Sequence, residues 1–145
     1  MVIAGNHALT GPEGRYWEEE IAPQLKSGSV EYVGEVNDAQ KAELLGQAAA
    51  MIVPVEWDEP FGIVFAEALA CGTPVISTSR GALPEIVTQG VEGFLVNSIE
   101  EGCNAVARVG EIDRHACRRR AAEHFSAGVV VSRYERLYAE LVAAG

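Results

Sequence analysis

The sequence is poor in the residues that disulfides and metal sites require. Its three cysteines, Cys71, Cys103 and Cys117, are an odd number without Cys-x-x-Cys spacing, which predicts reduced thiols in a cytoplasmic protein. Its three histidines stand apart from the cysteines and from one another, so we expect no metal site. The apolar runs are short and broken by proline, glycine or charge, which predicts no membrane span, and the first residues lack the basic segment of a signal peptide.

Positive charge is also scarce. The chain has 11 Lys and Arg residues against 21 Asp and Glu residues, a formal charge of −10. Nucleic acids and anionic membranes attract proteins through Lys and Arg, so we expect neither as a partner. An anionic ligand would need backbone dipoles or a few local basic residues to overcome the acidic field. The one basic run, Arg118–Arg120, is interpreted as a solvated helix face.

The length of 145 residues, 48% of them apolar, predicts one globular domain. Residues 5–14 read as a turn, and a helix that follows is expected to be interrupted or ended near Pro23. We expect strands at 1–4, 30–34, 50–55, 74–77 and 93–96, and helices at 16–26, 37–48, 60–71, 83–87, 98–109, 113–124 and 126–144. The expected N-caps are Asn37 or Asp38, Ser98 in a capping box with Glu101, Asp113 and Ser126.

Alternation of strands and helices predicts the α/β class with a doubly wound parallel sheet, Rossmann-like, in a single domain with extra C-terminal helices. Ligands of such sheets bind beyond the carboxyl ends of the strands. The segments expected there are 35–37, 54–62 and 77–84. The final segment, 126–145, carries an apolar stripe at helical spacing and is expected to pack on its own domain, on a partner domain or on a second copy.

The most informative stretch runs from Glu59 to Glu67. Pro60 suits the first helical position, and Asp58 or Glu59 could cap a helix that begins there. Such an end leaves backbone N–H groups unpaired and adds partial positive charge, which suits a phosphate, and Gly62 lets an anion approach the backbone closely. Glu67 would lie about two turns into the helix, roughly 10 Å from Glu59.

Two carboxylates that flank one anion site match a nucleotide diphosphate sugar, whose two sets of hydroxyls are separated by a pyrophosphate. The spacing alone leaves a second interpretation open, in which Glu59 and Glu67 are two solvated side chains. Phe61 could equally be a core aromatic, and Trp57 could stack on a ligand or pack across its loop.

A longer series of motifs resembles the family 4 retaining glycosyltransferases. Glu59-Pro60-Phe61-Gly62 with Glu67 resembles the E-x7-E signature of that family. Further segments resemble the family in the same order along the chain: 32–36, 44–48, 68–77, 80–85, 90–96, 125–126 and 134–138. The resemblance covers nearly the whole chain.

The resemblance implies the GT-B fold, in which two Rossmann-like domains face a cleft, and identifies residues 1–145 with its donor-binding domain. It implies that Glu59 binds hydroxyls of the donor sugar and is the catalytic residue, and that Glu67 takes the ribose hydroxyls. The remaining donor-binding positions that it implies are the backbone amides of Phe61, Gly62 and Ile63 at the sugar or diphosphate, Val64 beside the nucleotide, and Glu35–Val36 at the nucleobase.

The sequence has no Asp-x-Asp element, which fits the GT-B class, and the resemblance implies donor binding without a metal cofactor, through a helix dipole and basic residues. The sequence departs from the family in two other features. The basic pair that usually grips the pyrophosphate, and the N-terminal acceptor domain, would both precede Met1. Arg80 is the one basic residue in an expected ligand loop.

The sequence therefore predicts a glycosyltransferase donor domain that binds a nucleotide diphosphate sugar for retaining transfer to an acceptor hydroxyl. The alternative is a non-catalytic nucleotide-sugar binding module, because the isolated chain is expected to be inactive without an acceptor domain. The nucleobase, the sugar and the acceptor are left open. An interaction domain without a ligand, and a nucleotide-sugar epimerase, match the motifs less well.

Overall fold

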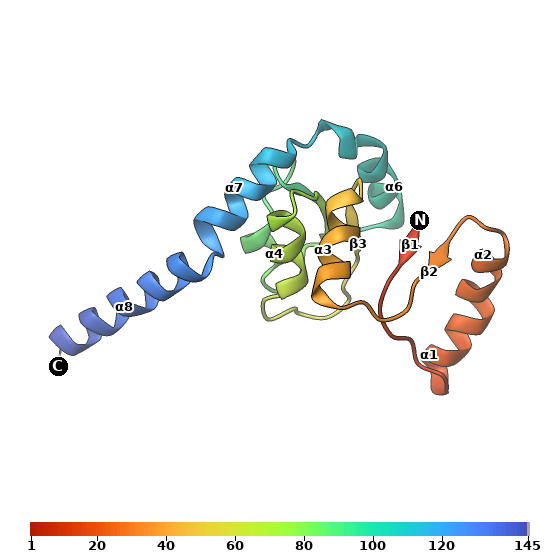
Figure 1. The fold of residues 1–145 in the computed structure, drawn as a ribbon, viewed down its shortest axis with the longest axis horizontal. Coiled ribbons are helices and arrows are strands. Elements are labelled where there is room, and N and C mark those ends of the chain that lie inside the picture. The colour runs from red at the N-terminus through yellow and green to blue at the C-terminus, as the bar shows by residue number, and fades with distance from the viewer. Residues whose placement is uncertain (145) are drawn as a thin grey trace. The chain divides into compact units, whose positions relative to one another are not determined.

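Strands and helices alternate along residues 1–144, the part of the chain that a computed structural model describes (Figure 1). Contacts between residues divide the chain into two units, Met1–Lys41 and Ala42–Gly145. All strand pairs are parallel, which confirms the α/β, Rossmann-like class. Hydrogen bonding distributes the described strands over two sheets, β1–β2 and β3–β4–β5. The sequence pattern marks strands but does not say which of them pair.

In the first unit, β1 (Val2–Ile3) lies parallel to β2 (Glu31–Tyr32). The connection is helical from Gly11 to Lys26: α1 (Gly11–Tyr16), a π-helical turn (Trp17–Ile21) and α2 (Ala22–Lys26). The expected turn over residues 5–14 is therefore confirmed for residues 5–10 and wrong for residues 11–14, and the expected break near Pro23 is wrong. Pro12 lies in the first turn of α1, where the missing N–H group is not needed, and Pro23 lies where the π-helical turn passes into α2.

In the second unit, β3 (Met51–Val53), β4 (Val75–Thr78) and β5 (Gly93–Val96) pair in chain order. Met51 lies opposite Val75, and Val75 opposite Gly93. A Cβ atom at position 93 would lie 1.9 Å from the Val75 carbonyl oxygen, so this contact between strands requires glycine. The central strand β4 is buried, as its unbroken apolar run predicts.

The expected helices are present with boundaries shifted by a few residues. They are α3 (Asp38–Gln47), α4 (Ile63–Ala70), α5 (Leu83–Ile86), α6 (Ile99–Arg108) with a 3-10 turn (Val109–Glu111), α7 (Arg114–His124) and α8 (Ala127–Ala143). No helix within residues 1–144 has the length and apolar character to cross a membrane.

Side-chain caps explain where several helices begin. The Asn37 side chain accepts from the Gln40 amide, the Ser98 hydroxyl accepts from the Glu101 amide, and the Asp113 carboxylate accepts from the His115 amide. These three expected caps are confirmed. Ser126 precedes α8 but makes no side-chain cap; its hydroxyl instead donates to the Ala122 carbonyl at 2.8 Å. The capping prediction there is wrong because the end of α7 offers an acceptor within reach.

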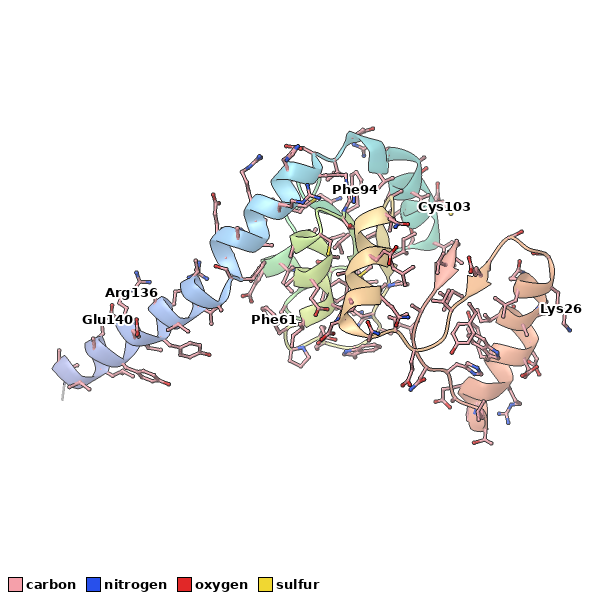
Figure 2. The ribbon with its side chains drawn as sticks, in the orientation of Figure 1. Lys26, Phe61, Phe94, Cys103, Arg136 and Glu140 are labelled. Carbon is pink, nitrogen blue, oxygen red and sulfur yellow. The ribbon has the colours of Figure 1, made fainter. Side chains whose placement is uncertain are left out.

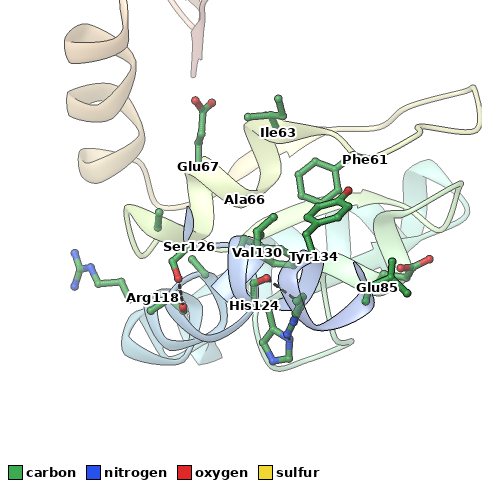
Figure 3. Close-up of a pocket in the computed structure, with 16 residues that line it drawn as sticks. Phe61, Ile63, Ala66, Glu67, Glu85, Arg118, His124, Ser126, Val130 and Tyr134 are labelled. Carbon is green, nitrogen blue, oxygen red and sulfur yellow. Dashed lines mark hydrogen bonds between the residues drawn. The ribbon is translucent and has the colours of Figure 1, made fainter. Parts of the chain in front are cut away.

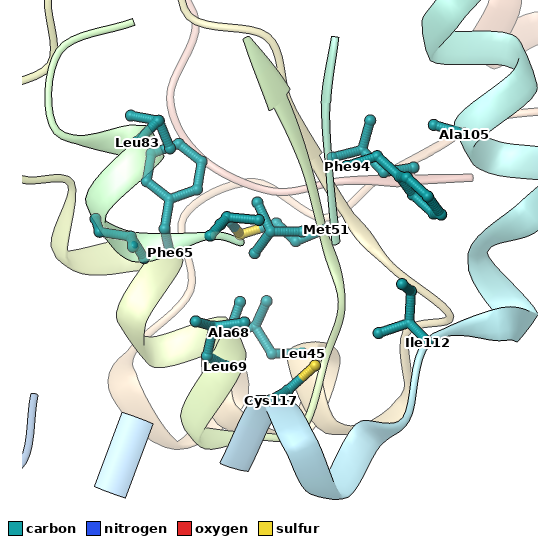
Figure 4. Packing of buried hydrophobic residues seen from close by; sticks show 14 of the residues in the cluster. Leu45, Met51, Phe65, Ala68, Leu69, Leu83, Phe94, Ala105, Ile112 and Cys117 are labelled. Atoms are coloured by element: carbon teal, nitrogen blue, oxygen red, sulfur yellow. The ribbon is translucent and has the colours of Figure 1, made fainter. Parts of the chain in front are cut away.

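The hydrophobic core lies in the second unit (Figure 4). Phe65 and Leu69 of α4 meet Ile76 of β4 and Leu83 of α5, and each of these side chains is at most 2% exposed. Every buried apolar residue of the described chain falls between Leu45 and Ala121. Burial of such side chains contributes about 1.5–3 kcal/mol each, so the core positions the loops that follow β3 and β4.

Candidate functional site

Helix α4 begins later than the sequence pattern predicts. Its N-cap is Gly62, at φ 78° and ψ 69°, and its first residue is Ile63. The prediction of a start at Pro60 or Phe61, capped by Asp58 or Glu59, is wrong, because a left-handed residue cannot lie inside a right-handed helix. A Cβ atom at position 62 would also lie 2.5 Å from a ring carbon of Phe65. Phe61 and Gly62 therefore belong to the preceding loop.

The tip of α4 leaves two backbone donors open. The Phe65 amide donates to the Gly62 carbonyl at 3.0 Å, whereas the amides of Ile63 and Val64 find no acceptor within residues 1–144. Unpaired first-turn amides and the helix dipole together favour an anion. Glu67 is the fifth residue of α4, about 6 Å along the axis from Ile63, so it lies one turn into the helix and not two.

Glu59 is fixed by two neighbouring segments. Its carboxylate accepts a hydrogen bond from the Trp57 indole N–H at 2.9 Å, and its backbone carbonyl accepts from the Ala82 amide at 2.9 Å. Gly81 packs against the same backbone, since a Cβ atom there would lie 2.3 Å from the Glu59 carbonyl oxygen. The loops after β3 and β4 thus lock together, and Trp57 orients the carboxylate.

The role of Trp57 is one that sequence reasoning missed. Its side chain is 59% exposed, so it neither fills the core nor packs tightly across its loop. No local pattern indicated this contact, because Trp57 lies in a bend and not in a strand with regular alternation.

A groove of about 1060 Å³ runs beside α4 (Figure 3). Phe61, Ile63 and Glu67 line it, whereas Glu59, Gly62 and Val64 do not. Its other walls come from α7 and α8, with Glu85 of α5. Figure 3 shows Glu67 projecting away from Val130 and Tyr134 of α8. The groove is therefore mainly an apolar channel between helices, with one of the two predicted carboxylates at its margin.

Phe61 lines this groove. Its ring meets that of Phe125 edge to face, with centroids 5.8 Å apart, and its side chain is 42% exposed. Phe61 is accordingly not part of the buried core. The contribution of Phe125 and of α8 to the groove could not be foreseen from local sequence, because it depends on how α7 packs on α4 and on how α8 follows α7.

Glu35 and Val36 lie in the first unit, in the loop that follows β2. The Glu35 carboxylate accepts a hydrogen bond from the Asn6 amide at 2.5 Å, and the Gly5 amide donates to the Gly34 carbonyl at 2.8 Å. The loop is thus tied to the segment after β1. In the same unit, the rings of His7 and Trp17 stack with centroids 3.8 Å apart.

Two observations on residues 1–144 concern metal ligands and thiol reactivity. These residues include no group of three His, Cys, Asp or Glu side chains placed to hold a metal ion. Burial, and next the charge of Glu92, raises the pKa of the Cys117 thiol to about 11, so this cysteine stays protonated near neutral pH. What the site offers is hydrogen bonding: open amides, fixed carboxylates and apolar walls.

Comparison with known proteins places this geometry in context. The sequence model of the family "Glycosyl transferases group 1" matches residues 1–124. A phosphatidyl-myo-inositol mannosyltransferase of Mycobacterium leprae (strain TN) is 32% identical over 142 residues, which cover 91% of this chain and 38% of the relative. The chain thus spans about two-fifths of that protein.

Two solved structures share the fold over nearly the whole chain. One is AviGT4, a glycosyltransferase involved in avilamycin A biosynthesis, with TM-score 0.72, 30% identity and coverage of 99% of this chain and 44% of that one. The other is Anabaena HepE in complex with UDP-glucose, with TM-score 0.70, 25% identity and coverage of 98% and 40%.

Proposed function

Because the chain belongs to the group 1 glycosyl transferases, we propose that it binds a nucleotide diphosphate sugar as the donor domain for retaining transfer of the sugar to an acceptor hydroxyl. The observation that carries this proposal is the tip of α4. Its open amides at Ile63 and Val64 lie between Glu59 in the preceding loop and Glu67 in the next turn. An anion with hydroxyl groups on both sides fits that order of groups.

In this proposal the amides of α4 bind the diphosphate, and the two glutamates bind hydroxyl groups. The amides of Ile63 and Val64 stabilise negative charge that develops on the leaving diphosphate, with help from the helix dipole. Glu59, oriented by Trp57, accepts hydrogen bonds from the donor sugar, and Glu67 accepts from the ribose. Val64 lies beside the nucleotide, and the backbone of Phe61 and Gly62 completes the loop. Glu35 and Val36 remain predictions for a contact with the nucleobase.

Two further points support the proposal and shape its test. HepE, which shares the fold, was solved with UDP-glucose, so UDP and UDP-glucose are the first ligands to try. Stabilisation by backbone dipoles needs no metal ion, so we propose that binding is unchanged when divalent metals are removed with a chelator. Transfer to an acceptor is the reaction that this binding would serve.

Calorimetric titration of the folded chain with UDP and with UDP-glucose tests the proposal. Glu67→Gln should weaken both ligands, because both carry the ribose, whereas Glu59→Gln should weaken UDP-glucose alone. Loss of a hydrogen bond to a charged group corresponds to roughly a 10-fold to 100-fold rise in Kd. Glu100→Gln is the matched control, an exposed carboxylate in the first turn of α6, and should change neither value.

The proposal fails if folded protein gives no heat with UDP, GDP, ADP or UDP-glucose at millimolar ligand. It also fails if neither glutamine variant differs from Glu100→Gln. Circular dichroism of each variant separates loss of the site from loss of the fold.

A further inference from the structure

Trp57, in the loop after β3, carries an aromatic ring that its own unit leaves uncovered. The side chain is 59% exposed, whereas tryptophan is on average highly buried in folded proteins. Its loop lies at the edge of the second unit, where Figure 2 shows Phe61 beside the start of α4. The ring is therefore an accessible apolar surface next to the open amides of α4.

The ring is exposed and yet held in one orientation. Its indole N–H donates to the Glu59 carboxylate at 2.9 Å. Glu59 is itself held from two sides. Its carbonyl accepts from the Ala82 amide, and its Cγ lies 3.1 Å from the place that a Cβ atom at position 62 would take. A ligand would thus meet a ring that is already in place, which lowers the entropy cost of binding.

The hydrogen bond between Trp57 and Glu59 leaves both partners able to bind a ligand. The N–H bond lies in the plane of the indole, so this contact uses the edge of the ring and not its faces. A carboxylate has two oxygens that only accept, and the second oxygen of Glu59 has no donor within residues 1–144. A sugar carries the matching groups: hydroxyls at its rim that donate, and C–H bonds on its face that pack on an aromatic ring.

Charge around Trp57 favours a neutral group there. Residues 56–59 read Glu-Trp-Asp-Glu, with three carboxylates and no basic side chain. A phosphate would be repelled by these carboxylates, whereas a hydroxyl can donate to them. The ribose, with its nucleobase, lies at Glu67 in the proposed function, on the other side of the open amides. The part of the donor left for Trp57 is the sugar that is transferred.

We propose, resting on the proposed function, that Trp57 is the platform for the donor sugar. One face of its indole packs against the C–H face of a hexopyranose, and its N–H positions the Glu59 carboxylate for a hydroxyl at the rim of that sugar. Such packing favours pyranoses with equatorial hydroxyls, because an axial hydroxyl would interrupt the C–H face. Trp57 thus strengthens the binding of the sugar nucleotide and not that of the free nucleotide.

Calorimetric titration of the 145-residue chain with UDP and UDP-glucose tests the proposal. Trp57→Leu should raise the Kd of UDP-glucose about tenfold and leave that of UDP unchanged, because it removes the ring and the N–H. Trp57→Phe keeps an aromatic face and should raise the Kd of UDP-glucose about fivefold. In a Glu59→Ala chain, Trp57→Phe should add no further loss, because the N–H acts through the carboxylate, whereas Trp57→Leu should still weaken binding.

Fluorescence gives a second readout, which a purely structural role of Trp57 would not move. The chain has two tryptophans, so Trp17→Phe leaves Trp57 as the one emitting indole. UDP-glucose should shift its emission to shorter wavelength, because a sugar on the ring displaces water, and UDP should not. Tyr138→Leu is the matched control for the loss of an aromatic ring. Tyr138 is 60% exposed on α8, and its replacement should change neither Kd.

A Trp57→Leu chain that is folded by circular dichroism and keeps the parent Kd for UDP-glucose overturns this inference. Equal weakening of UDP and UDP-glucose also overturns it, as does an emission that UDP-glucose leaves unchanged. In these cases binding by the parent chain leaves the proposed function standing. If the parent binds neither ligand, the proposed function fails and this inference fails with it.

Discussion

Gly81 shows how strongly one residue can fix this site. Its φ of 54° is in the left-handed region, and its missing side chain lets the loop after β4 touch the backbone of Glu59. Gly62 does the same one loop away, where it ends the loop after β3 and begins α4. Two glycines thereby decide the path of the chain that carries Glu59 and the open amides.

Cys117 gives a prediction at the same scale. Its side chain is fully buried, and its thiol approaches the Glu92 carbonyl at 3.7 Å (Figure 4). Burial raises the pKa of this thiol from 9.0 to about 11. Above pH 9 the unfolded chain therefore loses the proton first and binds fewer protons than the folded chain. The contribution of this thiol to the unfolding free energy is fully present below pH 9. It should fall by about 2 kcal/mol as the pH rises to 11.

Urea denaturation at pH 8, 9 and 10.5 measures that fall. Cys117→Ala should show a shallower decline of unfolding free energy across this range than the parent chain. Cys103→Ala, at an exposed cysteine, should keep the parent slope. Equal slopes for the two variants would mean that Cys117 is not the group responsible.

At the scale of elements, α7 holds the ends of three other helices. Arg114 donates to the Ala48 and Gly46 carbonyls at the end of α3, and Arg118 to the Cys71 carbonyl at the end of α4. Arg120 donates to the Glu85 carbonyl in α5. The interpretation of Arg118–Arg120 as a solvated face holds for Arg118 and Arg119, which are exposed, and is wrong for Arg120, which is half-buried. Arg118 also donates at the end of α4, where positive charge is favourable.

Arg114→Met tests this arrangement, since methionine keeps an apolar stem and removes the donors. The variant leaves two carbonyls and the Thr73 hydroxyl without the guanidinium, so we expect a loss of about 1–3 kcal/mol in unfolding free energy. Arg119→Met is the control: Arg119 is exposed, and its ion pair with Asp113 spans 3.6 Å. That variant should lie within about 0.5 kcal/mol of the parent. Losses of the same size for both would contradict the capping role.

At the scale of the whole molecule, stability is unevenly distributed between the two units. All the buried apolar residues belong to the unit that begins at Ala42, whereas within Met1–Lys41 the one buried residue is Gly14. The first unit relies on a two-stranded sheet and the ring cluster of His7, Trp17 and Tyr32. Short sheets without a core are marginal in water.

Amide hydrogen exchange should therefore protect β4 far more than β1 and β2. We expect the amides of Ile76 and Ser77 to exchange near the rate set by global unfolding, and those of β2 to exchange at least 100-fold faster through local opening. Mass spectrometry of peptides from residues 1–41 and 72–80 measures the two rates. Equal protection would show that the two units unfold together.

Much of the site could be predicted from the sequence, because the residues that indicate it lie close together in the chain. The E-x7-E spacing, Pro60 and Gly62 identified the loop and the helix, and the motif series identified the family that the sequence comparison confirms. The start of α4 was misplaced because proline at N1 and a left-handed glycine favour different boundaries. The close approach of the Phe65 ring to position 62 requires glycine there, so the helix begins after Gly62.

By itself, the sequence determined the parallel α/β class, most helix ends and the segment that carries the start of α4, because hydrophobic period, capping residues and turn glycines act over a few residues. Tertiary structure alone decided the division of the strands into two sheets, the locking of Gly81 against Glu59, the arginine caps of α7 and the groove beside α8. Each of these joins residues far apart in the chain, and no local preference specifies which distant carbonyl, ring or backbone a side chain will meet.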